Sequence, residues 1–192
     1  MGALSIGVLG GTFDPIHIAH MVLAQEAQWQ LGLDRVLLVP AGQPWRKEDR
    51  KVSDFAARAE MVRLAAGHLD YLEVSLLEGE RPGPSYIVET LSQLRELYPQ
   101  SLLTLILGQD ALADLEHWKD PEGIRRLARL AVAGRSGSDG TDKLGPYVEI
   151  DMPRMDISSS MIRERIRRGQ PWQVFVAPAV AAHIEREGLY SA

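Results

Sequence analysis

The 192-residue chain contains no cysteine, only 6% aromatic residues and no long apolar run. Without cysteine, disulfides, iron–sulfur clusters, thiolate zinc sites and cysteine nucleophiles are all excluded. No apolar stretch approaches the roughly 20 residues of a membrane-spanning helix. The run Leu4–Leu9 also has no basic flank of the kind that precedes a secretion signal. We therefore expect a cytoplasmic protein with no membrane partner.

Positive charge is scarce as well, because 21 Lys and Arg residues face 26 Asp and Glu residues, for a formal net charge of −5. This balance argues against a general nucleic-acid binder. The basic residues nevertheless cluster, in Arg46–Lys51 and in Arg154–Arg168. Local basic groups on an acidic protein suit a small polyphosphate ligand better than a long duplex. A homo-oligomer stays open, because nothing in the sequence decides the oligomeric state.

Apolar runs alternate with segments of helical periodicity along the whole chain. The predicted strands are Ser5–Leu9, Arg35–Val39, Leu72–Val74, Leu102–Leu107, Ala128–Ala133 and Tyr147–Ile150. The predicted helices are Ala19–Leu31, Asp54–Ala66, Tyr86–Leu97, a segment around Pro121–Arg126, Ser159–Arg168 and Pro178–Glu187. Strands that are apolar throughout are typical of a sheet covered on both faces. We predict one α/β domain over residues 1–192, a Rossmann-like doubly wound parallel sheet with helices on both faces. Residues 151–192 form its small C-terminal helical part, and Gly134–Gly145 is a polar, glycine-rich loop.

The segment after the first strand reads Gly10-Gly11-Thr12-Phe13-Asp14-Pro15-Ile16-His17-Ile18-Ala19-His20. It completes neither a dinucleotide fingerprint nor a P-loop. The pattern predicts a tight turn at Gly10-Gly11. Such a turn alone is a weak signal, but two histidines three residues apart at a helix start can both reach one phosphate. A metal pair is the alternative, and it needs a third protein ligand, for which Asp14 is the nearest carboxylate. The pattern favours phosphate binding.

A second segment, Ile157-Ser158-Ser159-Ser160-Met161-Ile162-Arg163, places three serines at a predicted helix start. Their hydroxyl and backbone N–H groups suit an anion, and Arg163 lies one turn further on, where a guanidinium can bind phosphate oxygens. Plain helix capping, worth about 1 kcal/mol, is the alternative. A second anion-ready helix start in one chain shifts the balance toward phosphate.

Together these segments resemble the nucleotidyltransferase superfamily, which carries (H/T)xGH near the N-terminus and ISSTxIR near the C-terminus. The GGTFDPIHxxH variant is similar to the bacterial nicotinate-nucleotide adenylyltransferases, whereas phosphopantetheine adenylyltransferases typically have Thr at the position of His17. The resemblance covers essentially the whole chain. It extends over Pro40–Lys47, Arg81–Tyr86, Leu107–Asp110 and Trp118.

The resemblance implies a role for each matching residue. His17, His20 and Arg163 would be the catalytic residues on the ATP triphosphate. The ATP-binding residues would be Gly10, Gly11, Thr12, Phe13, Gly108, Asp110, Ser159 and Ser160. The residues that bind the second substrate, the nucleotide that accepts AMP, would be Lys47, Tyr86, Ile87 and Trp118, with Trp118 stacked on its pyridine ring. Mg²⁺ would be bound mainly through ATP phosphates and water, with no dedicated protein ligands.

Several of these residues have an ordinary structural alternative. Trp118 could fill the core, Asp110 could cap a helix, and Lys47 could be a solvated surface residue. The chain also departs from the family pattern. Ala19 replaces a glycine and Ser160 a threonine, Trp45-Arg46 stands where many members have Pro-His, and Ile87 replaces a threonine.

The implied reaction transfers AMP from ATP to nicotinate mononucleotide, giving deamido-NAD and pyrophosphate in NAD biosynthesis. Two alternatives remain open at this point. One keeps the chemistry with nicotinamide mononucleotide or phosphopantetheine as the acceptor, and the other is a nucleotide-sensing module without turnover.

Overall fold

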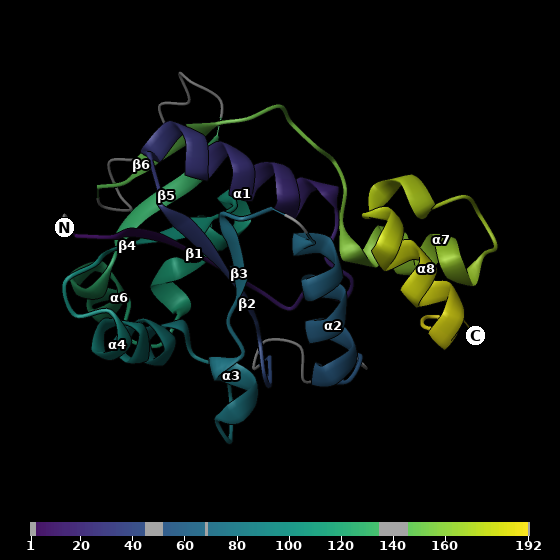
Figure 1. The fold of residues 1–192 in the computed structure, drawn as a ribbon, viewed down its shortest axis with the longest axis horizontal. Helices are drawn as coiled ribbons and strands as arrows, with labels where there is room; N and C mark the ends of the chain where they lie inside the picture. The colour runs from purple at the N-terminus through teal and green to yellow at the C-terminus, as the bar shows by residue number, and fades with distance from the viewer. Residues whose placement is uncertain (1–2, 45–51, 68, 135–145, 192) are drawn as a thin grey trace.

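The computed structural model describes residues 3–44, 52–67, 69–134 and 146–191 (Figure 1). The strands are β1 (Ser5–Gly11), β2 (Arg35–Pro40), β3 (Leu72–Val74), β4 (Leu102–Leu107), β5 (Arg129–Gly134) and β6 (Val148–Asp151). The α-helices are α1 (Ile18–Leu31), α2 (Phe55–Ala66), α3 (Leu77–Glu80), α4 (Ile87–Leu97), α5 (Gln109–Ala113), α6 (Pro121–Leu127), α7 (Ser159–Arg167) and α8 (Pro178–Glu187). Two 3₁₀ turns, η2 (Leu115–His117) and η3 (Gln173–Phe175), complete the described elements.

The six described strands form one parallel sheet in the order β3-β2-β1-β4-β5-β6. The strand order reverses between β1 and β4, which are hydrogen-bonded neighbours. In doubly wound sheets, ligands bind outside the carboxyl ends of the strands at this reversal. Here β1 ends at Gly11 and β4 at Leu107, with Gly108 directly after it. These residues therefore mark the expected position of a site.

Helices cover both faces of the sheet, as Figure 1 shows with α1 above the strands and α4 and α6 below them. One core cluster joins the sheet to α1 and α2 through residues such as Ala24 and Met61. The second joins the other face to α4, α5 and α6 through Leu91, Leu112 and Ile124. Two buried faces explain why the strands are apolar without alternation.

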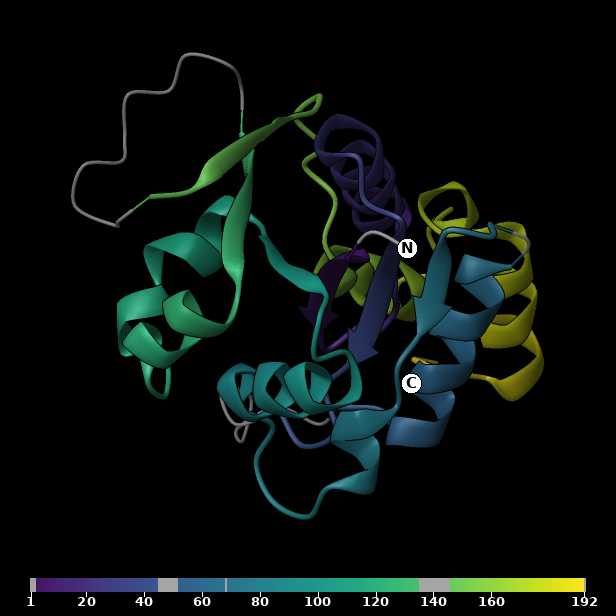
Figure 2. The ribbon, with the colours of Figure 1, turned by 60° about the vertical axis from the view of Figure 1, so that its left-hand side comes forward.

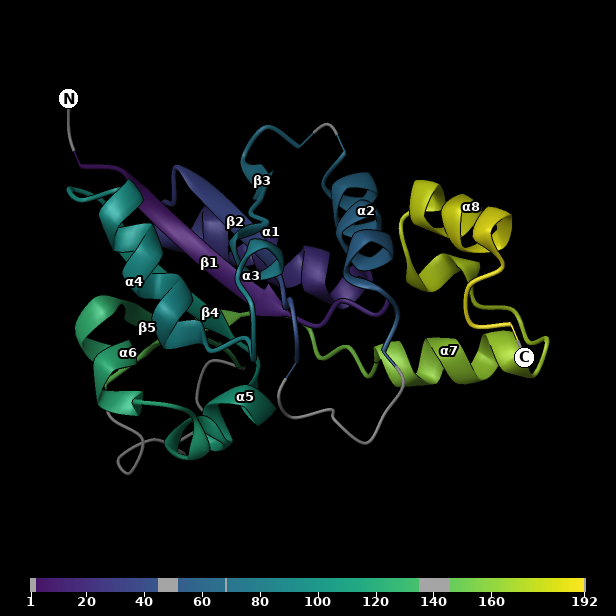
Figure 3. The ribbon, with the colours of Figure 1, turned by 90° about the horizontal axis from the view of Figure 1, so that it is seen from below.

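The C-terminal helices pack at the α2 side of the sheet (Figures 1, 2 and 3). Helix α8 contacts α2, and Ile162 of α7 and Ile184 of α8 belong to the same cluster as Met61 of α2. Burial of these apolar side chains is the force that holds the C-terminal helices against the sheet layer. Within the described ranges, no helix has the length and apolar character needed to cross a bilayer.

The predicted fold class, strands and longer helices are confirmed, with ends that differ by at most two residues. One prediction about β1 is wrong. Gly10 and Gly11 do not form the turn; they are the last strand residues, paired with Val39 and Pro40 of β2. The turn begins at Thr12. Helices α3 and α5 and both 3₁₀ turns were not predicted, and the predicted loop beyond Gly134 lies outside the described residues.

Candidate active site

The carboxyl end of β1 is open because its last two residues lack side chains. Gly10 is exposed, and a Cβ atom placed there would lie 3.4 Å from Cδ1 of Ile87 in α4. A Cβ atom at Gly11 would lie 2.7 Å from Cε1 of Phe13. Phe13 needs that space because its backbone is left-handed, with φ of 50°, and its ring turns back into the core. The two glycines thus let the chain reverse tightly and leave the strand end accessible.

His17 and His20 lie together at the start of α1, where His17 is the N-cap residue. Their rings stack with centroids 3.7 Å apart and planes 24° apart, and the edge of Phe13 meets His20 at 5.0 Å. Nδ1 of His20 accepts a hydrogen bond from the backbone N–H of His17 at 3.2 Å. A neutral His20 therefore carries its proton on Nε2.

His17 is only 6% exposed, and this burial lowers its pKa from 6.5 to about 4. A charged imidazole is disfavoured where water cannot solvate it. His17 is thus neutral at pH 7 and can offer a ligand a hydrogen bond, but not a charge. Its Nδ1 atom is buried and has no hydrogen-bond partner among the described residues.

The serine segment at the start of α7 has three different contacts. Ser158 caps the helix by accepting from the backbone N–H of Met161 at 3.1 Å, so the capping alternative holds for this serine. Ser159 Oγ donates to the carbonyl of Pro15 at 2.9 Å. Ser160 Oγ accepts from Nη2 of Arg163 at 3.2 Å. Two of the serine hydroxyls therefore hold protein groups in place.

Arg163 links the two predicted motifs directly. Its Nη1 atom donates to the carbonyl of Asp14 at 2.6 Å and lies 3.8 Å from the Asp14 carboxylate. Asp14 and Pro15 stand immediately before the histidine pair, so the N-terminal ends of α1 and α7 meet at the carboxyl end of β1. The structure brings His17, His20, Ser159, Ser160 and Arg163 into one place.

Two residues of this site, Arg58 and Tyr190, were missed in the sequence. Arg58 of α2 is 1% exposed and donates to the carbonyls of Thr12 at 2.8 Å, Ser53 at 2.8 Å and Gly42 at 3.1 Å. Its position three residues before Met61 places it on the buried face of the helix, which was the available signal. Tyr190, described below, gave no such pattern, and Asp14 was considered only as a possible metal ligand.

Gly108 and Asp110 lie at the end of β4, beside the β1 end in the sheet order. Gly108 is the N-cap of α5, and a Cβ atom there would meet open space. Asp110 lies in the first turn of α5 with an exposed side chain, and it is not the capping residue. No hydrogen bond or ion pair of Asp110 is found within the described part of the chain. This geometry leaves both residues accessible to a ligand.

Two of the predicted acceptor residues, Tyr86 and Ile87, lie at the start of α4, and Trp118 directly follows η2. Tyr86 is the N-cap of α4, and the Lys119 amine lies 4.3 Å from the centre of its ring. Trp118 is half-buried: it packs on the second core cluster and its Nε1 donates to Asp114 at 3.3 Å. The core alternative therefore holds for part of Trp118, and stacking on a ligand stays a prediction for the rest. Lys47, with Trp45-Arg46, lies outside the described residues.

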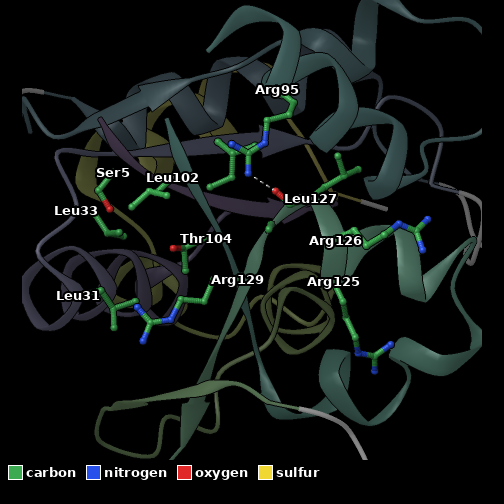
Figure 4. Close-up of a pocket in the computed structure, with 12 residues that line it drawn as sticks. Ser5, Leu31, Leu33, Arg95, Leu102, Thr104, Arg125, Arg126, Leu127 and Arg129 are labelled. Carbon is green, nitrogen blue, oxygen red and sulfur yellow. Dashed lines mark hydrogen bonds between the residues drawn. The ribbon is translucent and has the colours of Figure 1, made fainter. Parts of the chain in front are cut away.

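A cavity of about 220 Å³ lies at the opposite end of the sheet, where the strands begin (Figure 4). It is lined by the amino ends of strands, including Ser5, Leu102 and Arg129, and by arginines. The Arg95 guanidinium donates to the carbonyls of Ser101 at 2.6 Å and Leu127 at 2.8 Å. None of the predicted site residues lines this cavity, so it is separate from the site at the carboxyl ends.

Comparison with known proteins agrees with the predicted fold and family. Residues 8–165 match the cytidylyltransferase-like family. The chain therefore belongs to this family of nucleotidyltransferases. A probable nicotinate-nucleotide adenylyltransferase of Thermus thermophilus is 42% identical over 187 residues, covering 97% of this chain and all of the relative. One of Dehalococcoides mccartyi is 40% identical over 201 residues, covering 99% and 98% of the two chains. Within the nucleotidyltransferases, this chain is thus a member of the nicotinate-nucleotide adenylyltransferase family.

The fold is also that of solved structures. Nicotinic acid mononucleotide adenylyltransferase of Plasmodium falciparum, complexed with NaAD, has a TM-score of 0.79 at 20% identity and covers 97% of each chain. A putative nicotinate-nucleotide adenylyltransferase of Vibrio parahaemolyticus has a TM-score of 0.75 at 19% identity, over 97% of this chain and 95% of the other. At these identities the likeness establishes the fold.

Proposed function

We propose that the chain transfers AMP from ATP to the phosphate of nicotinate mononucleotide, releasing pyrophosphate and forming deamido-NAD. An oxygen of the acceptor phosphate bonds to the α-phosphorus, and the bond from this phosphorus to the β-phosphate oxygen breaks. The acceptor is already an anion at neutral pH, so the reaction needs no general base. The convergence of the α1 and α7 starts on the carboxyl end of β1 is the observation that carries the proposal.

Catalysis then rests on position and on charge neutralisation at the phosphates. The guanidinium of Arg163 supplies the fixed positive charge, and its contacts with Asp14 and Ser160 define where that charge lies. Neutral His17 and the Nε2–H of His20 supply hydrogen bonds at the same end of the sheet. Because developing negative charge passes to the leaving pyrophosphate, donors that are already oriented lower the barrier.

The nucleotide side is proposed at Gly10–Phe13 and at Gly108 and Asp110. The exposed end of β1 and the open space at Gly108 let a ligand approach the backbone closely. The exposed Asp110 carboxylate suits the hydroxyl groups of a ribose. On the acceptor side, the accessible part of Trp118 suits a pyridine ring, with Tyr86 and Ile87 nearby at the α4 start.

Mg²⁺ is proposed to arrive with the nucleotide, where it neutralises charge on the phosphate oxygens. The described residues contain no group of three or more histidine, aspartate and glutamate side chains that could hold a metal ion. The carboxylate nearest the phosphate turn, Asp14, is buried and already hydrogen-bonded. Phosphate oxygens and water are therefore the proposed ligands of the ion.

A pyrophosphate-release assay with ATP and Mg²⁺ tests the proposal. It compares nicotinate mononucleotide, nicotinamide mononucleotide and phosphopantetheine at equal concentrations, with a reaction lacking any acceptor as the blank. We expect the highest kcat/KM with nicotinate mononucleotide and a dinucleotide product in equal amount to pyrophosphate. Faster release with either other acceptor would reassign the substrate. Nucleotide binding without release in any arm would favour a sensor instead.

A further inference from the structure

The carboxylate of Asp14 is held by a residue from the far end of the chain. Asp14 is 3% exposed, and its Oδ1 atom accepts a hydrogen bond from the Tyr190 hydroxyl at 2.8 Å, across 176 positions of sequence. Its Oδ2 atom accepts from the backbone N–H of Ser53 at 3.4 Å and lies 3.8 Å from Nη1 of Arg163. The Tyr190 bond is thus the shorter of the two that orient this carboxylate.

The chain adopts a costly conformation to bring Tyr190 there. Helix α8 ends at Gly188 in the left-handed conformation, and Leu189 N donates back to Ile184 O at 3.0 Å. Tyr190 itself has φ of 65°, a region that side chains other than glycine rarely adopt. A strained residue persists where its surroundings demand it. The hydroxyl also lies 3.8 Å from Sδ of Met61, so α2 contributes to its pocket.

We propose that Tyr190 is a positioning residue for the adenylyl transfer. By orienting the Asp14 carboxylate, its hydroxyl sets the place of the Arg163 guanidinium. This inference rests on the proposed function, in which Arg163 acts on the phosphates. Arg163 holds the Asp14 carbonyl at 2.6 Å while the Asp14 carboxylate stays 3.8 Å away. Without the tyrosine donor, the buried carboxylate turns toward the guanidinium and draws it from the phosphates.

The hydroxyl is a hydrogen-bond donor throughout the working pH range. Burial, followed by the negative charge of Asp14, raises the pKa of Tyr190 well above its ordinary value of 10. The tyrosine therefore acts as a neutral donor to an anion, and the proton is not transferred. Partners that orient metal ligands by such hydrogen bonds are worth about 10-fold to 100-fold in activity, and we expect an effect at the lower end of that range here.

The test replaces Tyr190→Phe, which removes one oxygen atom and keeps the ring. We expect kcat to fall about 10-fold while the KM values for ATP and nicotinate mononucleotide change less than about twofold, because the Tyr190 hydroxyl donates to Asp14 and acts on the substrates only through it. Tyr190→Met, which fills the space without a donor, should behave in the same way. The matched control is Tyr71→Phe, because no hydrogen bond of the Tyr71 hydroxyl is found in the described ranges, and it should keep the kcat of the parent protein.

A double-mutant cycle separates positioning from folding. In an Arg163→Lys background, which changes the group being positioned, Tyr190→Phe should lower kcat less than about twofold. All variants are assayed at a temperature where circular dichroism shows them folded. A kcat within twofold of the parent for both Tyr190 variants, or an equal loss in the Arg163→Lys background, would overturn the proposal. A parent protein that releases no pyrophosphate would instead refute the proposed function.

Discussion

Burial of His17 predicts a loss of stability in mild acid that can be assigned to this one residue. The folded protein holds the pKa of His17 at about 4, whereas the reference value is 6.5. A depressed folded pKa means that the unfolded chain binds the proton first. The contribution to stability is therefore fully present above pH 6.5 and is lost as the pH falls from 6.5 toward 4.

The size of this effect follows from the width of the window. One pKa unit corresponds to about 1.4 kcal/mol. Unfolded His17 binds its proton below pH 6.5, whereas folded His17 stays neutral down to about pH 5. Of the interval between pH 7.5 and pH 5, about 1.5 pH units therefore contribute to the change. The His17 contribution to the free energy of unfolding should thus fall by about 2 kcal/mol over this interval.

Urea unfolding of the parent protein and of His17→Gln at both pH values measures this contribution. The difference in unfolding free energy between the two proteins should shrink by about 2 kcal/mol from pH 7.5 to pH 5. His117→Gln is the matched control, because the side chain of His117 is 75% exposed, and it should show no comparable change. A difference that stays constant within about 0.5 kcal/mol would show that His17 is not buried as described.

Three further predictions concern turnover, acceptor binding and packing. His20→Ala and Arg163→Ala should each lower kcat about 10²–10³-fold in the folded protein, and near-normal turnover would contradict their roles. Trp118→Ala should raise the KM for nicotinate mononucleotide at least about fivefold, because aromatic stacking on a base is worth about 1–3 kcal/mol, and an unchanged KM would leave Trp118 a core residue. Gly42→Ala should lower the free energy of unfolding by about 1–3 kcal/mol in urea, because its methyl group would overlap the Glu78 carbonyl oxygen. An unaltered midpoint would show that the loop can shift.

The strands could be predicted from sequence because a strand buried on both faces is apolar at every position and does not alternate. The run Leu102–Leu107 is apolar throughout, and it is a strand over the same residues. Helices α3 and α5 have four and five residues, too few to show a helical period. The sequence predicts a turn at Gly10 and Gly11, because it does not show that these glycines continue the strand pairing with Val39 and Pro40.

The site could be predicted in part, because its two motifs are local in sequence. The burial of His17 and the hydrogen bond from Tyr190 to Asp14 depend on tertiary packing, and no local sequence pattern predicts either. Tyr190 lies 176 positions from its partner, and nothing near it marks its hydroxyl as buried. Lys47 lies outside the described residues, so its phosphate contact stays a prediction.

The Arg58 guanidinium has a consequence for exchanging parts of this protein with those of relatives. One side chain donates to carbonyls of two connections, to Thr12 between β1 and α1 and to Gly42 and Ser53 between β2 and α2. A connection transplanted from a relative would have to place its carbonyl oxygen within hydrogen-bond distance of the Arg58 guanidinium, whose donors have a fixed geometry. The two connections are therefore coupled through Arg58, and a change in the backbone of one requires a matching change in the other.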